Sequence, residues 1–374
     1  MYLFSTLKRH LHVLVALSAI SFSAFSQSIT TVSPTTVTNR SSITITGTGF
    51  TTSNANVRVN GVAATNVVVV SANQITAQAP SIATSGSYNV SVGNPATSTF
   101  PVTYVAPTAT TISARVSRVI TDFNGYWSST SENSSGIQPD TQHNLIGFRY
   151  GPDNTVFSTG VNNTTLTANS VGFTAGDFRA LPIISVSGNT TSSTFIALAT
   201  KVDGNATAKV PTAPGVAGLK LKDVLIDGIK GLGLGTGITN ISSGATLDFT
   251  VNNIVTEKIA DAEPDIIITQ TASPDTGNVN DIYYFSDNAG NIVGSPISAN
   301  LNLITAVGSY RVDLFTVTQN TTNEAAVLVT GATGAGFDIG ARPIRVAAFK
   351  LSEFGITDTN KGNATRFKVI PSGN

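Results

Sequence analysis

The chain has 374 residues, of which 11% are charged and 41% hydrophobic, and its 21 basic and 21 acidic residues give a formal net charge of zero. This length is sufficient for two or three domains, each with its own core. The low charge argues against disorder driven by charge repulsion, and the absence of a basic patch argues against a nucleic-acid partner. Asn, Thr and Ser crowd the polar positions, which is typical of short strands joined by turns.

Residues 1–26 are predicted to be a secretory signal peptide. Lys8 and Arg9 give a positive start, residues 11–20 are apolar, and residues 24–26 begin and end with a small residue. This order is that of a signal peptide, whereas the apolar run is short for the alternative, a membrane anchor. We therefore expect an exported protein that keeps no transmembrane segment after cleavage.

The sequence contains no cysteine. Secreted eukaryotic β-proteins of this size usually carry disulfides, so the composition favours a bacterial exported protein. It also excludes lipid attachment through an N-terminal cysteine, a thiol nucleophile, and a zinc site with cysteine ligands. The expected location is outside the cell or on its surface.

Residues 28–105 are predicted to form a β-sandwich of about seven short strands. Turn signals such as Asn60-Gly61 and Ser85-Gly86 separate segments in which apolar and polar residues alternate. The apolar positions are Ile43/Ile45, Val57/Val59, Val67/Val69, Ile75/Ala77, Tyr88/Val90/Val92 and Phe100/Val102/Tyr104.

The stretch "SSITITGTGF", residues 41–50, has the glycine spacing of a strand end or of a phosphate-binding loop. Together with "VRVNGVAA", "ITAQAP", "GSYNVSVGN" and "FPVTYV", in this order, it resembles an IPT/TIG domain, a family with an immunoglobulin-like sandwich fold. The resemblance implies that Gly47 and Gly49 form a bend and that Phe50 fills the core. A phosphate-binding loop would need a following helix, and residues 51–54 offer none.

Residues 106–111, "APTATT", are predicted to be a linker, and residues 112–374 a second, larger unit. At least ten strand-like runs and few helical ones favour a single β-sandwich of jelly-roll type, with two smaller sandwiches as the alternative. "YYFSDNAGNIVGSPI" predicts a hairpin with its turn at residues 288–291. Residues 218–232 have the spacing of one short amphipathic helix, and "EKIADAEPD" and "LSEFGI" each predict a helical turn.

Three segments of the larger unit are similar to an uncharacterised secreted module of surface proteins in Bacteroidota-like bacteria. They are "GYWSSTSENSSGIQPDTQHNL", "TAGDFRALP" and "AAFKLSEFGIT". The resemblance implies a surface location and carries no reaction.

Catalysis by histidine depends on a single residue, because only His143 remains after signal removal. It follows Asp140, but no GxSxG motif accompanies it. We interpret His143 as a polar loop or strand-edge residue.

A glycosidase needs only two carboxylates, so the scarcity of histidine does not exclude one. The acidic residues on or near predicted strands are Asp248, Glu257, Glu263, Asp265, Asp281 and Asp313. Asp265 opens a very apolar segment, where burial would raise its pKa, although an aspartate at a strand start more often caps a turn. The Asx/Gly-rich stretches 286–291 and 358–363 lack the spacing of a calcium loop, and we interpret them as turns. No metal and no cofactor is predicted.

A sugar-binding site on a β-sandwich combines an aromatic face with polar side chains. Asn124, Tyr126 and Trp127 lie in one loop-like stretch, and Arg149 and Tyr150 lie in another. The alternative is that Trp127, the single tryptophan, packs inside the sandwich. The five residues are the predicted ligand site.

Together these features predict an all-β, exported, non-catalytic protein. We expect an immunoglobulin-like sandwich, acting as a spacer or interaction arm, followed by a larger jelly-roll-like domain. The expected role is binding or adhesion at the cell surface, with a glycan, the extracellular matrix or a cell-surface protein as the ligand. A polysaccharide-active hydrolase with paired carboxylates and a purely structural surface protein are the alternatives.

Overall fold

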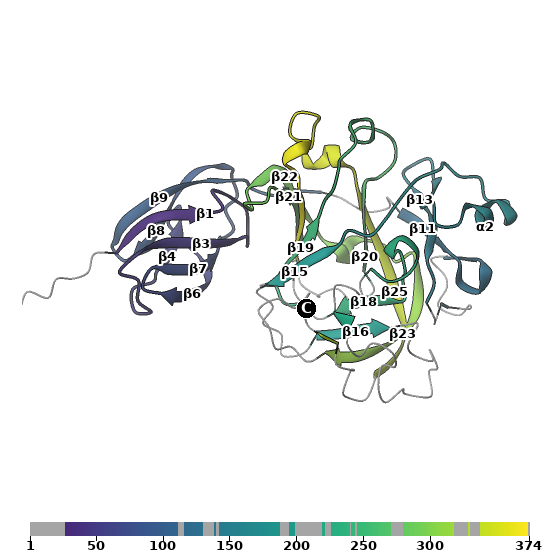
Figure 1. The fold of residues 1–374 in the computed structure, drawn as a ribbon, viewed down its shortest axis with the longest axis horizontal. Coiled ribbons are helices and arrows are strands. Elements are labelled where there is room, and N and C mark those ends of the chain that lie inside the picture. The colour runs from purple at the N-terminus through teal and green to yellow at the C-terminus, as the bar shows by residue number, and fades with distance from the viewer. Residues whose placement is uncertain are drawn as a thin grey trace, which may run out of the picture.

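The computed structural model places two β-rich units next to each other, the smaller at the left of Figure 1 and the larger at its centre and right. It describes residues 27–110, 116–129, 138–139, 142–187, 194–198, 219–220, 226–239, 241–243, 245–270, 280–317, 328–329 and 337–372. The predicted signal peptide lies outside these ranges. Within them, no helix has the length and apolar character needed to cross a membrane.

The first unit is a sandwich of two sheets, with strand orders β1-β3-β7-β6 and β2-β9-β8-β4-β5. Its strands are β1 (Ser28–Ser33), β2 (Thr36–Val37), β3 (Ser42–Thr48), β4 (Val57–Val59), β5 (Val62–Ala63), β6 (Thr65–Ser71), β7 (Gln74–Gln78), β8 (Gly86–Gly93) and β9 (Ala96–Tyr104). The alternating apolar residues meet in one core between the sheets, which includes Ile43, Ile45, Val57, Val59, Ile75, Val90, Val102 and Tyr104. Alternation along each strand therefore predicted this core correctly.

The glycines of the stretch 41–50 have a structural role. A Cβ on Gly47 would overlap the Ser28 carbonyl and the Phe50 ring, so glycine lets β1 approach β3 closely. Gly49 has a φ of 74°, a left-handed conformation, and the chain then turns Phe50 into the core. The prediction of a bend followed by a core phenylalanine is confirmed.

The larger unit contains a six-stranded sheet, β10-β22-β21-β26-β19-β15, a four-stranded sheet, β12-β11-β13-β14, a five-stranded sheet, β18-β16-β23-β25-β20, and the pair β17-β24. The strands of the first two are β10 (Thr108–Ala109), β11 (Val116–Thr121), β12 (Trp127–Ser128), β13 (Leu145–Tyr150), β14 (Thr155–Ser158), β15 (Ile183–Ser187), β19 (Thr246–Thr250), β21 (Asp281–Ser286), β22 (Ile292–Ala299) and β26 (Arg366–Ile370). The others are β16 (Thr194–Leu198), β17 (Leu219–Lys220), β18 (Thr236–Thr239), β20 (Ile266–Gln270), β23 (Gly308–Val317), β24 (Leu328–Val329) and β25 (Phe337–Phe349).

Helical segments in the described residues are short. They are α2 (Asn163–Ala168) and the 3₁₀ turns η1 (Phe123–Gly125), η3 (Ile229–Gly231), η4 (Thr256–Lys258), η5 (Leu301–Leu303), η7 (Leu351–Phe354) and η8 (Lys361–Asn363). The helix predicted for residues 218–232 is wrong where the chain is described. Strand β17 lies near the start of this range, and the 3₁₀ turn η3 lies near its end. Gly228 and Gly231 have φ values of 85° and 74°, which interrupt a helix there. The hairpin β21–β22 and the turns η4 and η7 are confirmed.

Strand β25 separates two cores of the larger unit. Ala347 and Phe349 point into the first, whereas Val346 and Ala348 point into the second. The first, called the Phe285 core, includes Tyr283, Phe285, Phe349, Phe354 and Phe367. The second, called the Phe148 core, includes Val119, Trp127, Phe148, Phe157, Tyr310 and Ile344.

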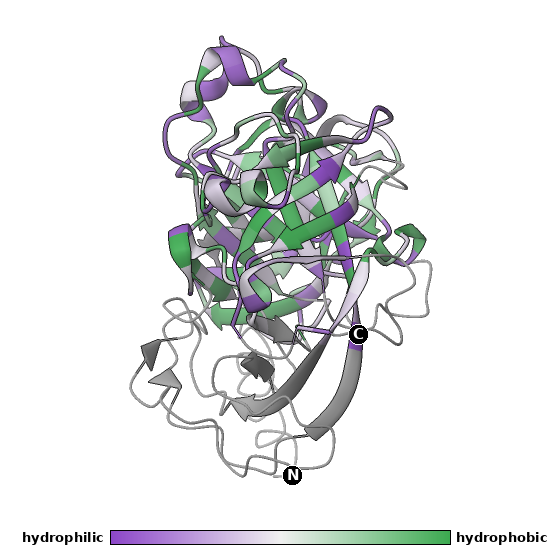
Figure 2. Cartoon of the chain, turned by 90° about the vertical axis from the view of Figure 1, so that its right-hand side faces the viewer, coloured by the Kyte–Doolittle hydropathy of each residue, from purple (hydrophilic) through white to green (hydrophobic). Residues whose placement is uncertain are grey.

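The pair β20–β25 therefore forms a middle layer between the six-stranded and four-stranded sheets, as its place in Figure 1 also shows. Strands with both faces buried carry continuous apolar runs, as in residues 266–268 and 346–349. Figure 2 shows hydrophobic strands at the centre of the unit and hydrophilic residues on the surrounding turns. The all-β class is confirmed, and the larger unit adds a third layer to the predicted sandwich.

Candidate functional site

The predicted aromatic site has two buried rings. Trp127 is 8% exposed and packs against Tyr310, with 6.4 Å between ring centroids. Tyr150 is 9% exposed and packs against Phe157 at 6.3 Å. Neither side chain offers the open ring face on which a sugar stacks, which favours the alternative of core packing for Trp127.

The four-stranded sheet also keeps the two halves of that site apart. Trp127 pairs with Thr121, which pairs with Leu145 at the start of β13, whereas Arg149 and Tyr150 lie at its end. Four residues of strand separate the halves by roughly 13 Å. Asn124 is exposed in η1, and Tyr126 and Arg149 are half-buried. The ligand-binding role of the five residues stays a prediction.

His143 lies in a loop beside the bridge residue Asn144, in line with the interpretation of the sequence, but its side chain is buried in the interior. Its ring packs edge-on against Tyr310, with 4.9 Å between centroids, and against Phe123 at 6.0 Å. Its carbonyl accepts a hydrogen bond from the Leu234 amide. Asp140, the partner considered in the sequence, lies outside the described residues.

The strand-borne acids have structural partners. Asp248 forms an ion pair of 3.3 Å with Lys368 across β19 and β26. Asp281 accepts hydrogen bonds from the Tyr283 hydroxyl at 2.9 Å and the Ser372 amide at 2.6 Å. Glu257 is exposed on η4, and the side chain of Asp313 lies outside the described part of the chain.

Asp265 combines the two properties expected of it. Its Oδ2 accepts the Leu351 amide at 2.7 Å and so caps η7. Burial raises the pKa of the Asp265 carboxyl to about 6; the Leu351 hydrogen bond opposes this shift, and neighbouring Asp261 and Glu263 add to it. Because its carboxylate is engaged by a backbone amide, Asp265 is a positioned cap for the loop that follows β25.

A group of charged side chains meets beside this cap. We call Asp177, Arg179, Lys230, Lys258, Asp261 and Glu263 the charged cluster. Lys258 contacts Glu263 at 2.7 Å and Asp261 at 3.1 Å, and Lys230 contacts Asp177 at 2.5 Å. A Cβ on Gly176 would overlap the Glu263 carboxylate, so Glu263 lies against the backbone directly before Asp177.

The cluster is electrostatically balanced. Hydrogen bonding and charge from Lys230, with a smaller contribution from Arg179, hold the pKa of Asp177 below its ordinary value. Glu263 and then Asp261 raise the pKa of Lys258. The cluster thus combines three acidic and three basic side chains, so its formal charges balance.

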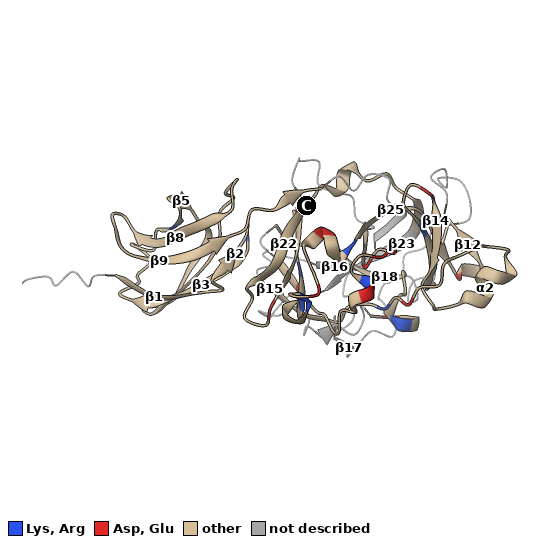
Figure 3. Ribbon diagram, turned by 90° about the horizontal axis from the view of Figure 1, so that it is seen from above, with Lys and Arg blue, Asp and Glu red and all other residues tan. Residues whose placement is uncertain are grey.

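Several parts of the chain build the cluster. Asn144 accepts the Ile229 amide at 2.8 Å and is itself held by Asp122, which fixes the turn that carries Lys230. Lys350 donates to the Asp261 carbonyl at 2.8 Å. Asn144, Asp177 and Lys350, one residue from each of the three segments singled out in the sequence, thus lie in or beside the cluster. Figure 3 shows acidic and basic residues gathered in the larger unit and very few in the first.

Sequence reasoning considered Glu263 only as a catalytic acid and did not find the cluster. Its ion pairs join residues up to 53 positions apart, as for Asp177 and Lys230, and no local pattern marks such pairs. The only local signal was Lys258 followed by two acids within five residues.

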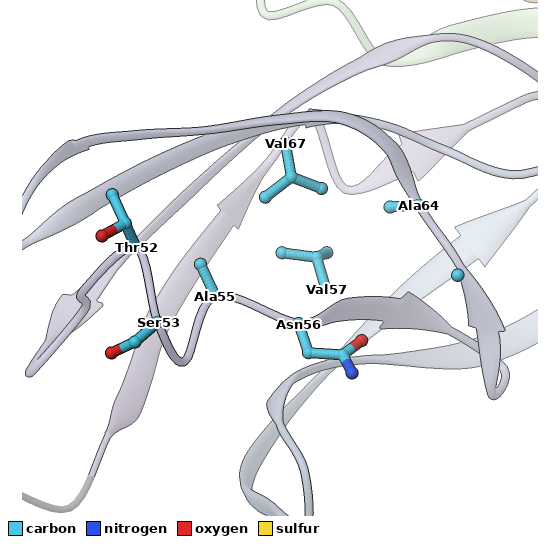
Figure 4. Close-up of a pocket in the computed structure, with 8 residues that line it drawn as sticks. Thr52, Ser53, Ala55, Asn56, Val57, Ala64 and Val67 are labelled. Atoms are coloured by element: carbon cyan, nitrogen blue, oxygen red, sulfur yellow. The ribbon is translucent and has the colours of Figure 1, made fainter.

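The first unit carries a hollow on its surface. It has a volume of about 340 Å³ and no charged residue on its walls (Figure 4). Its lining residues are Thr52, Ser53, Ala55, Asn56, Val57, Ala63, Ala64 and Val67. It is wide open, and its small side chains offer little for specific recognition.

The described residues contain no group of three or more His, Asp or Glu placed to hold a metal ion. In the stretch 286–291, the Asp287 carboxylate accepts the amides of Ala289 and Asn291, which is turn chemistry. In 358–363, Asp358 pairs with Lys361 at 2.7 Å.

Comparison with protein families confirms the first resemblance, because residues 28–106 match the IPT/TIG domain. No curated protein matches the chain.

Several solved structures match weakly. A γ-CGTase from alkalophilic Bacillus clarkii is 13% identical, with 36% of this chain and 24% of that chain covered and a TM-score of 0.20. An auxiliary nutrient-binding protein from Bacteroides thetaiotaomicron is 14% identical, with 36% and 37% covered and a TM-score of 0.19. SGBP-B from a xyloglucan utilization locus of Bacteroides uniformis is 12% identical, with 93% and 98% covered and a TM-score of 0.18. The chain thus spans well under half of the first two structures, and TM-scores this low carry no argument about function.

Proposed function

We propose that the mature chain is an exported, non-catalytic binding protein of the cell surface whose charged cluster contacts a carbohydrate. Export rests on the predicted signal peptide at residues 1–26 and on a composition without cysteine. The observation that carries the binding role is the charged cluster itself.

The cluster is unusual for this chain, because only 11% of its residues are charged. Its outer members are open to solvent: the side chains of Arg179, Asp177 and Lys258 are 75%, 66% and 52% exposed. Glu263 lies beneath them at 12% exposed, and its Oε1 is buried against Gly176, with no hydrogen-bond partner among the described residues.

Balanced charge indicates the class of ligand. Sugar hydroxyls both donate and accept hydrogen bonds, so they suit a set of three acids and three bases. An anionic ligand would favour a surplus of basic groups. The half-buried ring of Phe178, between Asp177 and Arg179 in sequence, packs edge-on against Phe148 at 5.2 Å and so anchors this side of the cluster to the Phe148 core. A neutral polysaccharide fits these features best.

The hydrolase alternative depends on free, opposed carboxylates. Asp261 and Glu263 are paired with Lys258, and Asp265 caps η7. These contacts support binding over hydrolysis, although the raised pKa of Asp265 is a property that general acids share.

The test is retardation of residues 27–374 in native gels containing neutral polysaccharides of several backbone types. The double variant Asp177→Ala/Arg179→Ala should weaken retardation at least tenfold in apparent affinity. Arg58→Ala/Asp153→Ala removes one basic and one acidic side chain outside the cluster and is the matched control. Fluorescence of Trp127 verifies that each variant is folded.

The outcomes separate the alternatives. Equal retardation of the two double variants would reject the cluster as the site, and Asn124→Ala with Arg149→Ala would then test the first predicted site. Release of reducing ends in the same mixtures would overturn the non-catalytic assignment. No retardation by any polysaccharide would favour a structural role.

A further inference from the structure

The IPT/TIG domain, residues 28–106, is almost free of charge. It contains no aspartate, glutamate or lysine, and its charged residues are Arg40 and Arg58. Arg58 donates to the Gly61 carbonyl within its own hairpin at 2.8 Å. Arg40 instead reaches out of the domain, so the two arginines make a natural comparison.

The Arg40 guanidinium bridges two strands of the larger unit. Its Nη1 donates to the Pro371 carbonyl and its Nη2 to the Asn280 carbonyl, both at 2.6 Å. Pro371 directly follows β26 and Asn280 directly precedes β21, and these strands are neighbours in the six-stranded sheet. One side chain therefore holds two adjacent strand ends together.

The surroundings of Arg40 fit an anchored side chain. Burial lowers the pKa of its guanidinium from the ordinary value, and the charge of Asp281 opposes that effect. The backbone of Arg40 has a φ of 60°, and its amide donates to the Ala79 carbonyl at 2.9 Å. The residue is thus fixed at both ends, by its own domain and by the larger unit.

A second contact joins the domain to the hairpin β21–β22. Asn291 Oδ1 accepts the Thr35 amide at 2.9 Å, the Thr35 hydroxyl at 3.0 Å and the Thr36 amide at 3.3 Å. Asn291 is held in place by Asp287, which accepts its amide at 2.8 Å and its side-chain Nδ2 at 3.0 Å. The turn is therefore a preformed acceptor for the start of β2.

A third contact comes from the predicted linker. Residues 108–109 form β10, which pairs in parallel with β22, and the Thr110 amide donates to the Ser298 carbonyl at 3.0 Å. The connection is thus part of the six-stranded sheet. All three contacts gather at the end of the larger unit beside the first, where Figure 1 shows β21 and β22.

We propose that the IPT/TIG domain is a clamp on the six-stranded sheet, so that the two units unfold as one cooperative body. This differs from the spacer or interaction arm, joined by a short linker, that the sequence suggests. Loss of the Arg40 side chain leaves two strand-end carbonyls without their donors and releases neighbouring strands from each other. The proposal is independent of which ligand the charged cluster binds.

Differential scanning calorimetry on residues 27–374 tests the clamp, with Arg40→Ala and Arg58→Ala as matched variants that each remove one of the domain's two charges. The parent protein should show one transition. Arg40→Ala should lower its midpoint by about 3 °C or more, or split it into two. Arg58→Ala should stay within about 1 °C of the parent.

Arg40→Lys keeps the charge but cannot reach both carbonyls with one planar group, and it should fall between the other variants. Hydrogen exchange supplies a readout that survives a poorly folding variant: amides of β21 and β26 should exchange at least tenfold faster in Arg40→Ala than in Arg58→Ala. Two separate transitions in the parent protein, or equal effects of the two alanine variants, would overturn the proposal.

Discussion

The two units of this protein are both built from strands, yet they bury them differently. In the IPT/TIG domain, buried and outward residues alternate along each strand, as in β3 with Ile43 and Ile45 inside. In the larger unit, β25 buries consecutive residues, because a core lies on each of its faces. A strand in a two-layer sandwich needs one apolar face, whereas a strand in a middle layer needs two apolar faces.

The units also differ in where they place charge. The first holds two arginines in 79 residues, and one of them is used to contact the second unit. The second collects ionised side chains on its turns, where six of them form the charged cluster. The difference teaches that the IPT/TIG domain uses its scarce charge for a contact with the larger unit, whereas the candidate for ligand recognition lies in the larger unit itself.

The largest expected effect is in the three-layered unit. Phe349→Ala should destabilise the protein by about 3–5 kcal/mol, because the ring is fully buried between Tyr283 and Phe354. Trp127 lies in the other core, so its fluorescence in a urea titration reports whether the layers are coupled. The midpoint from fluorescence should fall together with that from circular dichroism.

Leu303→Ala is the control for that experiment, since Leu303 is one of the most exposed large apolar residues described. It should change stability by less than about 0.5 kcal/mol. If the fluorescence midpoint of Phe349→Ala equals that of the parent protein, the two cores unfold separately. The middle strand β25 would then not couple the layers of the larger unit.

A smaller effect is expected inside the IPT/TIG domain. The buried Tyr104 hydroxyl donates to the Pro80 carbonyl and accepts the Ile82 amide, each at 3.0 Å. Tyr104→Phe leaves both groups without their partner and should cost about 1–3 kcal/mol in chemical denaturation. Tyr88→Phe is the matched control, because its hydroxyl hydrogen-bonds the exposed Thr84, and it should cost under about 0.5 kcal/mol.

The smallest expected effect depends on pH. The pKa of Asp265 is raised from 3.8 to about 6 in the folded protein, so ionisation there opposes folding above that range. Asp265→Asn should therefore stabilise the protein at pH 7, by about 1–2 kcal/mol after allowance for partial solvent exposure, and have almost no effect at pH 4. Urea unfolding at several pH values measures this difference.

The control is Asp153→Asn, which removes one negative charge from an exposed turn. Its effect on stability should be small at each pH. A constant difference between Asp265→Asn and the parent from pH 4 to pH 7 would mean that Asp265 does not titrate in this window.

How much the sequence could predict depended on the distance over which each feature is encoded. Alternation and turn residues are local, so the strands of the first unit and the hairpin at Asp287 were predictable. The burial of Trp127 was not predictable, because an amphipathic ring suits either a core or a surface. It is buried by contacts with residues far along the chain, such as Tyr310. Lys230 was placed in a predicted helix because its apolar neighbours have helical spacing, yet the flanking glycines turn the chain instead.

The middle position of β25 restricts how the chain length can change in evolution. Insertion of one residue between Val346 and Phe349 would move every following side chain of the strand to the opposite face. Side chains that now pack in the Phe148 core would then point into the Phe285 core, and those of the Phe285 core would point into the Phe148 core. Insertions are therefore expected to accumulate in the turns of this unit, and the spacing within β25 should be the most strictly kept length in the protein.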